Sequence, residues 1–369
     1  MKSVTFFIDN LRIGGFQRLC LDQAYAFSDR GYKVTIIALQ ENEISNASFL
    51  ISENALIEKK NLQIVFASNS HLKQLMILLR ITKNLSSNDI LISHSLRATA
   101  LLRLAFILVL KRPKFTTTIH QLPTLSAAWQ RFKRFTYAQL SPVLTAYSNA
   151  VKSDWESRIS KFPFGARVLF SKEILVLRNG IYLPRIATNR SEVEVCTIPR
   201  LVFLGRLTSW KGFATFLNFA RHSHLCQFRL LLIVPAIPEE TIKDLIEEFG
   251  NRIEFVIGQS FDAYSPVPGD VHFYAAEYGQ DAKYIESISL NCLEMASVGT
   301  PSVVTIGGLK TWPDLEDLGL FYECNWNDVN LVIGQIFRAS KIKIDSEILE
   351  KIRETISIEK NVVKLEGLR

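Results

Sequence analysis

Short apolar runs alternate with helix-length segments from the start of the chain, and this rhythm limits what the chain can fold into. Several runs are continuously apolar, which indicates strands buried on both faces, as in a parallel sheet covered by helices. Strand, helix, strand at this spacing predicts a doubly wound α/β sheet. In the first half the strand-like segments are residues 4–8, 34–38, 64–67, 90–93, 115–119 and 143–147, and helical segments include 16–29, 71–85 and 99–110.

A second series of the same kind begins after about residue 195. Its strand-like segments are residues 201–205, 230–234, 253–257, 271–274 and 302–305, with helical patterns over 238–249 and 290–298. Residues 182–199 are polar, contain two prolines and show no period, as a linker would. The 369 residues are therefore expected to form two Rossmann-like α/β domains, at 1–185 and 195–345. Ligands of such sheets bind at the carboxyl ends of strands, so the chemistry is expected in a cleft between the domains.

Charge is divided unequally along the chain. Residues 1–190 hold 26 Lys and Arg against 11 Asp and Glu, a net charge of +15, whereas residues 191–369 carry −8. A basic first half suits an anionic partner such as a membrane leaflet or a charged glycan, although two solvated surfaces of unequal composition are the simpler alternative. No recognised nucleic-acid-binding motif accompanies the charge, so a nucleic-acid partner is not expected.

The five cysteines and the apolar runs indicate the cellular compartment in which the protein is expected. The cysteines, at 20, 196, 226, 292 and 324, form no CxxC pair, so neither a disulfide framework nor a zinc site is expected and a reducing cytoplasm fits best. The chain begins directly with a strand pattern, and its longest apolar stretch, 99–110, contains Arg103 and is shorter than the roughly 20 residues that span a bilayer. Residues 126–140 mix aromatic side chains with Arg131, Lys133 and Arg134, which fits either an anionic membrane surface or an ordinary amphipathic helix.

Two cations follow the first strand of the second half. Arg206 and Lys211 lie five residues apart in the loop after Gly205, before the next helical pattern. A diphosphate leaving group needs its growing negative charge neutralised as the bond to it breaks, and one Arg with one Lys can supply this. Two solvated charges on a surface turn are the alternative. Because Arg206 and Lys211 follow the carboxyl end of a strand, a diphosphate site is favoured over a surface turn.

Two carboxylates lie at the start of a later helix. Glu286 precedes a helix expected to begin near residues 289–291, Glu294 lies in its first two turns, and Gly299 ends it. A carboxylate can accept two hydrogen bonds from a vicinal diol, which both a sugar ring and a ribose present. The exposed N–H groups of Leu290 and Asn291 suit a phosphate. The alternative is that Glu294 only interacts with the helix dipole and Glu286 is an ordinary loop acid.

Three weaker features lie in the first half. Gly14 and Gly15 separate the first strand from the first helix, which permits close approach of a ligand but equally suits a tight turn. His94 and His120 each follow a strand of the same predicted sheet. Because the carboxyl ends of parallel strands share one edge, the two histidines are expected near the same ligand.

The order of these pieces resembles the retaining glycosyltransferases of family 4, which have the GT-B fold of two facing Rossmann-like domains. The likeness spans nearly the whole chain and is most specific in two places, the cation loop and the two Glu at E-x7-E spacing before Gly299-Thr-Pro301. Weaker shared pieces are Gly14-Gly15, Thr118-Ile-His120, Ala146-Tyr-Ser148 and Asn179-Gly180-Ile181. By this resemblance, residues 346–369 form a crossover helix that packs back on the first domain.

The resemblance implies a role for each candidate residue. Arg206 and Lys211 would hold the donor diphosphate, Glu286 the hydroxyls of the transferred sugar, and Glu294 the ribose. Leu290 and Asn291 would contribute backbone amides, and His120 would lie beside the sugar. Apart from the resemblance, their positions after strands make Gly14 and Gly15 expected donor contacts and His94 an expected acceptor contact. The family usually works without an essential metal, so no cofactor is expected beyond the nucleotide-diphosphate sugar itself. The implied reaction retains anomeric configuration, through attack on the same face as the leaving phosphate.

The chain also departs from the family pattern. Ser287-Ile-Ser289 stands where Gly-Phe-Gly is common, Gln17 where Glu is favoured, and Pro235-Ala-Ile-Pro238 where a glycine is usual. The sugar pocket is therefore expected to have its own shape. The expected function is transfer of a sugar to a glycan or lipid-linked acceptor in surface polysaccharide synthesis, by a cytoplasmic enzyme that associates with the membrane. A nucleotide-sugar epimerase, which would need no acceptor, and a catalytically silent sugar-nucleotide-binding protein are the alternatives.

Overall fold

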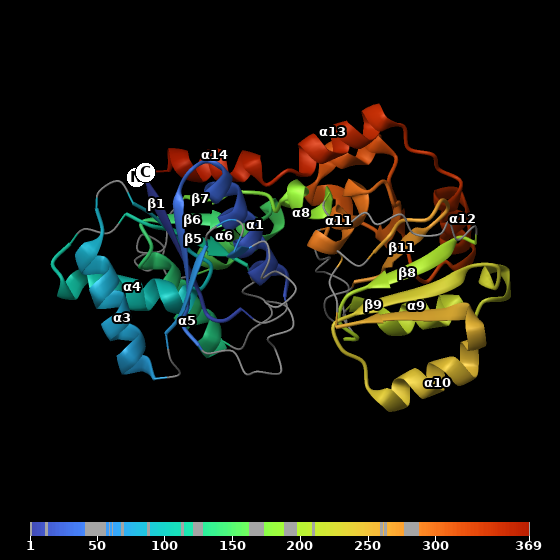
Figure 1. Ribbon diagram of the computed structural model, residues 1–369, viewed down its shortest axis with the longest axis horizontal. Coiled ribbons are helices and arrows are strands. Elements are labelled where there is room, and N and C mark those ends of the chain that lie inside the picture. Colours follow the sequence, from blue (N-terminus) through green and yellow to red (C-terminus); the bar gives the residue numbers. More distant parts are fainter. Residues whose placement is uncertain are drawn as a thin grey trace. The chain divides into compact units, whose positions relative to one another are not determined.

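The computed structural model contains two compact units, each built on a parallel sheet (Figure 1). Unit 1 comprises Met1–Tyr182 and Ile358–Arg369, and unit 2 comprises Leu183–Ser357. The structure describes residues 2–11, 14–40, 57–58, 60, 62–67, 70–86, 89–111, 114–120, 128–161, 173–187, 198–208, 211–258, 261, 264–276 and 288–368. The prediction of two doubly wound parallel α/β sheets is confirmed.

The sheet of unit 1 has seven parallel strands in the order β3-β2-β1-β4-β5-β6-β7. Strand β1 pairs with β2 on one side and β4 on the other, so that Phe6 lies between Ile36 and Ile92. The order of strands changes direction between β1 and β4, which makes their carboxyl ends the expected ligand position. The strands are β1 (Ser3–Ile8), β2 (Lys33–Ala38), β3 (Gln63–Phe66), β4 (Ile90–Ser93), β5 (Thr116–Ile119), β6 (Val143–Ala146) and β7 (Ile174–Val176).

Helices cover this sheet and bury its apolar side chains. One cluster joins Phe7 and Leu91 of the sheet to Leu102 and Phe106 of α4, and another surrounds Trp155 of α6. The helices of unit 1 include α1 (Gly15–Asp29), α3 (His71–Asn84), α4 (Leu96–Leu108), α5 (Ala128–Gln139), α6 (Asn149–Ile159) and α14 (Glu359–Gly367). Helix α4 begins three residues earlier than its apolar pattern because the Ser95 hydroxyl caps it, accepting from the Ala98 N–H at 3.2 Å.

The sheet of unit 2 has six parallel strands in the order β10-β9-β8-β11-β12-β13. They are β8 (Arg200–Leu204), β9 (Arg229–Val234), β10 (Ile253–Ile257), β11 (Val271–Tyr274), β12 (Ser302–Thr305) and β13 (Phe321–Cys324). The accompanying helices include α8 (Leu183–Ala187), α9 (Phe213–Ala220), α10 (Glu239–Phe249), α11 (Leu290–Ser297), α12 (Val329–Ser340) and α13 (Ser346–Ile356). The core is aromatic, with Phe203, Phe216 and Phe273 buried together. Here the strand order changes direction between β8 and β11.

Some elements differ from the expected ones. Helix α8 occupies the start of the segment expected to be a linker, and strands β7 and β13 add an edge strand to each sheet. The expected C-terminal helix is two helices, α13 and α14, because the chain is extended at Ser357 and the Ile358 N–H donates to the Ile181 carbonyl at 3.0 Å. Helix α14 then lies in unit 1, where Glu366 pairs with Arg30 at 2.7 Å. Within the described residues, no helix is both long and apolar enough to cross a membrane.

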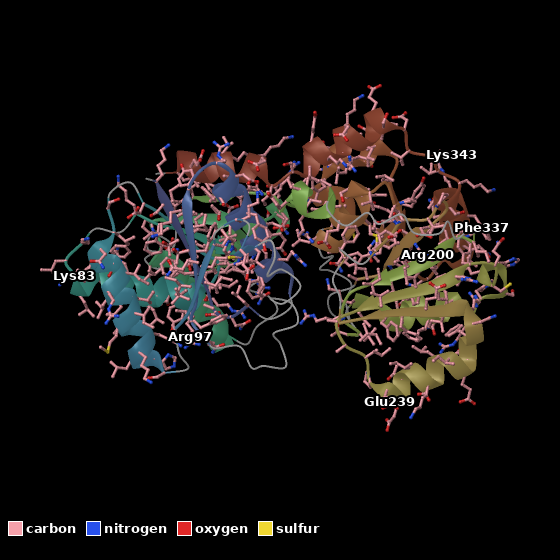
Figure 2. The ribbon with its side chains drawn as sticks, viewed as in Figure 1. Lys83, Arg97, Arg200, Glu239, Phe337 and Lys343 are labelled. Carbon is pink, nitrogen blue, oxygen red and sulfur yellow. The ribbon has the colours of Figure 1, made fainter. Side chains whose placement is uncertain are left out.

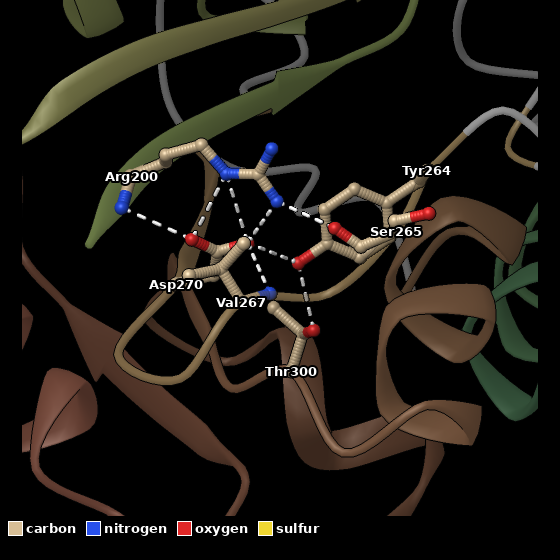
Figure 3. Close-up of polar contacts among 6 residues, drawn as sticks. All are labelled: Arg200, Tyr264, Ser265, Val267, Asp270 and Thr300. Atoms are coloured by element: carbon tan, nitrogen blue, oxygen red, sulfur yellow. Dashed lines mark hydrogen bonds and ion pairs between the residues drawn. The ribbon is translucent and has the colours of Figure 1, made fainter. Parts of the chain in front are cut away.

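A buried ion pair joins β8 and β11 at their amino ends, opposite the carboxyl ends where a ligand is expected (Figure 3). Asp270, directly before β11, accepts from the Arg200 side chain at 2.6 and 3.1 Å and from the Arg200 backbone N–H at 3.0 Å. The Tyr264 hydroxyl and the Val267 N–H also donate to this carboxylate, at 2.9 and 3.0 Å. Five donors on one buried carboxylate fix where β8 and β11 begin.

We expect Asp270→Asn to lower the free energy of unfolding of unit 2 by about 3–5 kcal/mol, because the buried Arg200 would lose its counter-charge. Urea unfolding followed by circular dichroism measures the change. Glu254→Gln is the matched control, since it removes the partner of Arg229 in a pair whose side chains are 39% and 40% exposed, and such pairs contribute at most about 1 kcal/mol. Equal losses in the two variants would contradict the importance of the buried pair.

Candidate functional site

The predicted cation loop of unit 2 begins at the carboxyl end of β8, next to β11. This is the position where the strand order of the sheet changes direction, and where open α/β sheets bind ligands. Gly205 follows β8 directly, Arg206 is exposed, and Lys211 is partly exposed at the start of the next helical turn. Both predicted cations therefore lie at the edge of the sheet that the fold makes available to a ligand.

Helix α11 begins at the same place. The Asn291 side-chain amide donates to the Leu204 carbonyl, the last of β8, at 2.8 Å. Gly205 has a φ of 142°, and a Cβ there would lie 3.3 Å from the Asn291 amide nitrogen, so a side chain would crowd this contact. Ser289 caps the helix, with its hydroxyl accepting from the Cys292 N–H. The N-terminus of α11 and the cation loop thus meet at the end of β8.

Lys211 is held at the end of β11 by a tyrosine. Its ammonium lies 3.0 Å from the Tyr274 hydroxyl oxygen, to which it donates, and 5.1 Å from the centre of the same ring. Gly212 permits this approach, because its φ is 74° and a Cβ would lie 2.4 Å from the Ala275 carbonyl oxygen. The lysine therefore spans from the loop after β8 to the end of the neighbouring strand.

A buried histidine lies beneath this lysine. His272, on β11, is fully buried and stacks 6.0 Å from Tyr274, and its Nδ1 lies 3.0 Å from the Ser302 hydroxyl. Burial, with the positive charge of Lys211 acting in the same direction, lowers the pKa of His272 to about 3. The histidine is therefore neutral at pH 7 and adds no charge of its own to the site.

Glu294, predicted to bind a ribose, is buried in the second turn of α11. One of its carboxylate oxygens accepts from Arg185 of α8 at 2.8 Å, and the two side chains are 6% and 3% exposed. Arg185 thus neutralises and orients the carboxylate. Glu286, the predicted sugar-binding residue, lies outside the described residues.

The two predicted histidines of unit 1 touch one another. His94 Nδ1 lies 2.9 Å from His120 Nε2, and His94 Nε2 lies 2.9 Å from the Gln23 side-chain oxygen. His94 follows β4 and His120 follows β5, at the edge where the strand order of this sheet changes direction. The expectation that the topology brings them together thus agrees with the geometry. His94 is only 4% exposed, so it contacts His120 rather than presenting a ring nitrogen of its own at the surface.

Aromatic rings flank His120. Tyr147 stacks on its ring at 6.2 Å with an interplanar angle of 15°, and Phe16 approaches at 5.6 Å. Burial lowers the pKa of His120 to about 4 and holds the pKa of His94 well below its ordinary value. Both rings are therefore neutral at pH 7, and the pair is a neutral hydrogen-bonding group.

The glycine pair lies beside this histidine pair. Gly14 is the N-cap of α1 and Gly15 is its first residue, followed directly by Phe16, which touches His120. The Gln17 side chain folds back over the pair, with its amide donating to Asn10 at 3.2 Å. A Cβ on Gly14 would lie 2.3 Å from the Gln17 side-chain oxygen, so a larger residue there would displace the Gln17 side chain.

Sequence reasoning missed three residues that the geometry adds. Tyr274 ends a predicted strand at the binding edge, so its position alone could have drawn attention to it. Gln23 lies on the predicted first helix and Arg185 in the predicted linker, and nothing in their spacing pointed to His94 or Glu294. In the part of the chain that the structure describes, no group of three or more His, Cys, Asp or Glu could hold a metal ion.

Comparison with solved structures identifies the fold. The HepE protein of Anabaena, solved with UDP, shares 16% identity and a TM-score of 0.65, over 99% of this chain and 97% of HepE. A glycosyltransferase of Rickettsia africae shares 17% identity and a TM-score of 0.64, over 98% and 94% of the two chains. The lipopolysaccharide outer core galactosyltransferase WaaB shares 15% identity and a TM-score of 0.61, over 98% of each chain.

The sequence itself matches one family. Residues 13–163 match the model of Glycosyltransferase Family 4, and this match lies within unit 1 and includes Gly14, His94 and His120. No curated protein sequence matches the chain. Residues 13–163 are therefore similar to Glycosyltransferase Family 4, and the fold of the chain is similar to that of the solved glycosyltransferases.

Proposed function

We propose that the chain is a retaining hexosyltransferase that moves a sugar from a nucleotide-diphosphate sugar to a glycan or lipid-linked acceptor in surface polysaccharide synthesis. One observation carries the proposal: the Asn291 amide bonds to the last carbonyl of β8. This contact brings the N-terminus of α11 to the loop that contains Arg206 and Lys211. Two cations and a set of helix N–H groups at one sheet edge suit a diphosphate.

The chemistry follows from the charge that a leaving group acquires. As the bond between the sugar and the diphosphate breaks, negative charge grows on the phosphate oxygens, and preformed cations lower the energy of that state. Lys211 is preformed because Tyr274 holds its ammonium at 3.0 Å. Arg206, exposed in the same loop, would provide the second cation for the diphosphate. The acceptor hydroxyl would attack on the same face and pass its proton to the leaving phosphate.

Other residues would recognise the rest of the donor. Glu294, oriented by Arg185 at 2.8 Å, would accept from the ribose hydroxyls with the oxygen that Arg185 does not occupy. Leu290 and Asn291 would contribute N–H groups to the phosphates, and Glu286 would bind the sugar. HepE has been solved with UDP-glucose, which supports a uridine nucleotide as the first donor to test.

Arg206→Ala and Lys211→Ala should each lower the rate of sugar transfer by at least about 100-fold, as expected for loss of one group that stabilises developing charge. The thermal unfolding midpoint should stay close to that of the wild type, because neither side chain is buried. Thermal-shift screening with UDP, GDP, ADP and their sugars would first identify the donor. Transfer is then measured with labelled donor and a panel of glycan and lipid-linked acceptors.

Lys243→Ala is the matched control, since Lys243 is 72% exposed on α10 and pairs only with an exposed Glu239 among the described residues. Full activity in both site variants would contradict the leaving-group role. If the donor sugar is isomerised when no acceptor is present, the protein is an epimerase instead. Tight nucleotide binding without transfer or hydrolysis would indicate a silent binding protein.

We also propose that unit 1 meets an anionic membrane through α3 and α4. Residues 59–153 contain 14 Lys and Arg but a single acidic residue, Asp89. The two helices pack against each other (Figure 1) and expose an unusual set of large apolar side chains. Those more than 40% exposed are Leu72, Met76, Leu104, Ile107 and Leu108, with Leu110 just beyond α4.

Exposed basic side chains lie on the same pair of helices. Lys73, Arg80 and Lys83 are exposed on α3, and Lys83 projects from the end of that helix (Figure 2). Exposed apolar side chains bordered by cations suit an interface with anionic lipid headgroups. The segment 126–140, which sequence reasoning singled out for this role, forms α5 from Ala128 onward, but its side chains at 128–133 lie outside the described residues.

The double variant Ile107→Ser with Leu108→Ser should lose most binding to vesicles that contain about one-third anionic lipid, because two apolar side chains would no longer enter the interface. Sedimentation with vesicles measures the bound fraction, and wild-type binding should weaken as salt rises. Ile246→Ser is the control: Ile246 is 50% exposed on α10, a helix rich in glutamate. Unchanged binding of the double variant would exclude α4 as the interface.

A further inference from the structure

Behind His120 lies a short chain of buried polar side chains that the donor site does not use. Gln23 of α1 and His94 are 3% and 4% exposed. We propose that they are positioning residues, which fix His120 in the tautomer whose Nδ1 carries no proton, so that His120 recognises a substrate hydroxyl by accepting its hydrogen. The identity of that hydroxyl as one on a sugar rests on the proposed transferase function. The tautomer of His120 does not depend on that function.

The direction of the hydrogen bonds from Gln23 to His120 follows from the first of them. The Gln23 side-chain oxygen, 2.9 Å from His94 Nε2, can only accept a hydrogen bond, so His94 Nε2 must carry the proton. A neutral imidazole has one N–H, and therefore His94 Nδ1 is bare and must accept. The hydrogen in the 2.9 Å contact between the two rings then belongs to His120 Nε2. By the same rule, His120 Nδ1 has no proton.

The argument requires both rings to be neutral, and the surroundings provide this. An imidazolium at either position would lie next to a second imidazole, with Phe6 stacked 5.9 Å from His94 and Tyr147 stacked on His120. Neither aromatic face replaces a counter-ion for a charge removed from water. The same burial lowers both histidine pKa values.

His120 is the member of the chain that can meet a ligand. Its residue is partly exposed, whereas His94 and Gln23 are not. No described residue is hydrogen-bonded to its Nδ1, and the ring centres of Phe16 and Tyr147 lie 5.6 and 6.2 Å from the ring centre of His120. The ring therefore offers one fixed acceptor between two aromatic groups. Such a group favours a hydroxyl over a keto, fluoro or deoxy carbon at the same position, because only the hydroxyl can donate.

Nuclear magnetic resonance of the free protein tests the tautomer without any substrate. The chain has six histidines, so nitrogen-labelled histidine gives few signals, and His120→Asn assigns the relevant one. We expect the Nδ1 signal of His120 at the position typical of an unprotonated imidazole nitrogen. Gln23→Met removes the acceptor that sets the direction and should produce a mixture of the two tautomers. Gln74→Met is the matched control, because Gln74 is equally buried in unit 1 and bonds to the Leu39 carbonyl and to Arg97.

A protonated Nδ1 in the wild type would overturn the proposal, and so would an unchanged His120 signal in a folded Gln23→Met variant. The wild-type measurement decides the matter even if that variant does not fold. Failure of the transferase assay would leave this result standing, so the two hypotheses fail separately.

The role in recognition is tested with donor analogues in which each sugar hydroxyl in turn is replaced by fluorine. One analogue should lose about ten-fold in kcat/KM with the wild type, the equivalent of one hydrogen bond. With Gln23→Met the same analogue should lose much less relative to the natural donor, whereas Gln74→Met should discriminate as the wild type does. Equal discrimination by wild type and Gln23→Met for every analogue would show that Gln23 is only structural.

Discussion

The candidate donor site depends on a single hydrogen bond, from the Asn291 side chain to the Leu204 carbonyl at 2.8 Å. It joins the start of α11 to the end of β8, two elements far apart in the sequence. It holds the start of the helix close to the loop that contains the two cations. The bond also explains why Gly205 is glycine, since a Cβ would lie 3.3 Å from the asparagine nitrogen. Lys211 is secured separately, by Tyr274 and by the close passage of Gly212 over Ala275.

The two units use the same edge of their sheets for different chemistry. In each sheet the strand order changes direction at one pair of strands, β1 with β4 and β8 with β11, and candidate side chains lie at the carboxyl ends of strands near that pair. Unit 2 offers fixed positive charge at this edge. Unit 1 offers a neutral pair of histidines whose pKa values burial lowers. Fixed positive charge suits a diphosphate, and a neutral hydrogen-bond acceptor suits hydroxyl groups.

Much of this could be predicted from the sequence, and the exceptions have physical reasons. Apolar runs such as Leu230–Val234 identify buried strands, and the strand-end positions of His94, His120 and Arg206 follow once the strands are known. Three things could not be read from spacing. Helix α8 lies in a polar, proline-containing segment, yet its Arg185 is buried because Glu294 neutralises it. Gln23 lies on the buried face of α1, and the sequence pattern of that face does not indicate a contact with a histidine. The helical pattern of the C-terminal segment continues across Ser357. There the Ile358 N–H donates a hydrogen bond to the Ile181 carbonyl, and the helix is divided into α13 and α14.

The central claim is that the cation loop and α11 together form a diphosphate site, and calorimetric titration tests it most directly. The dissociation constant of the nucleoside diphosphate is compared with those of the nucleoside monophosphate and the free nucleoside, at constant salt. The account predicts that affinity rises steeply with the second phosphate in the wild type, and that Asn291→Leu removes this gain while unit 2 stays folded. Equal affinity for the monophosphate and the diphosphate in the wild type would contradict it.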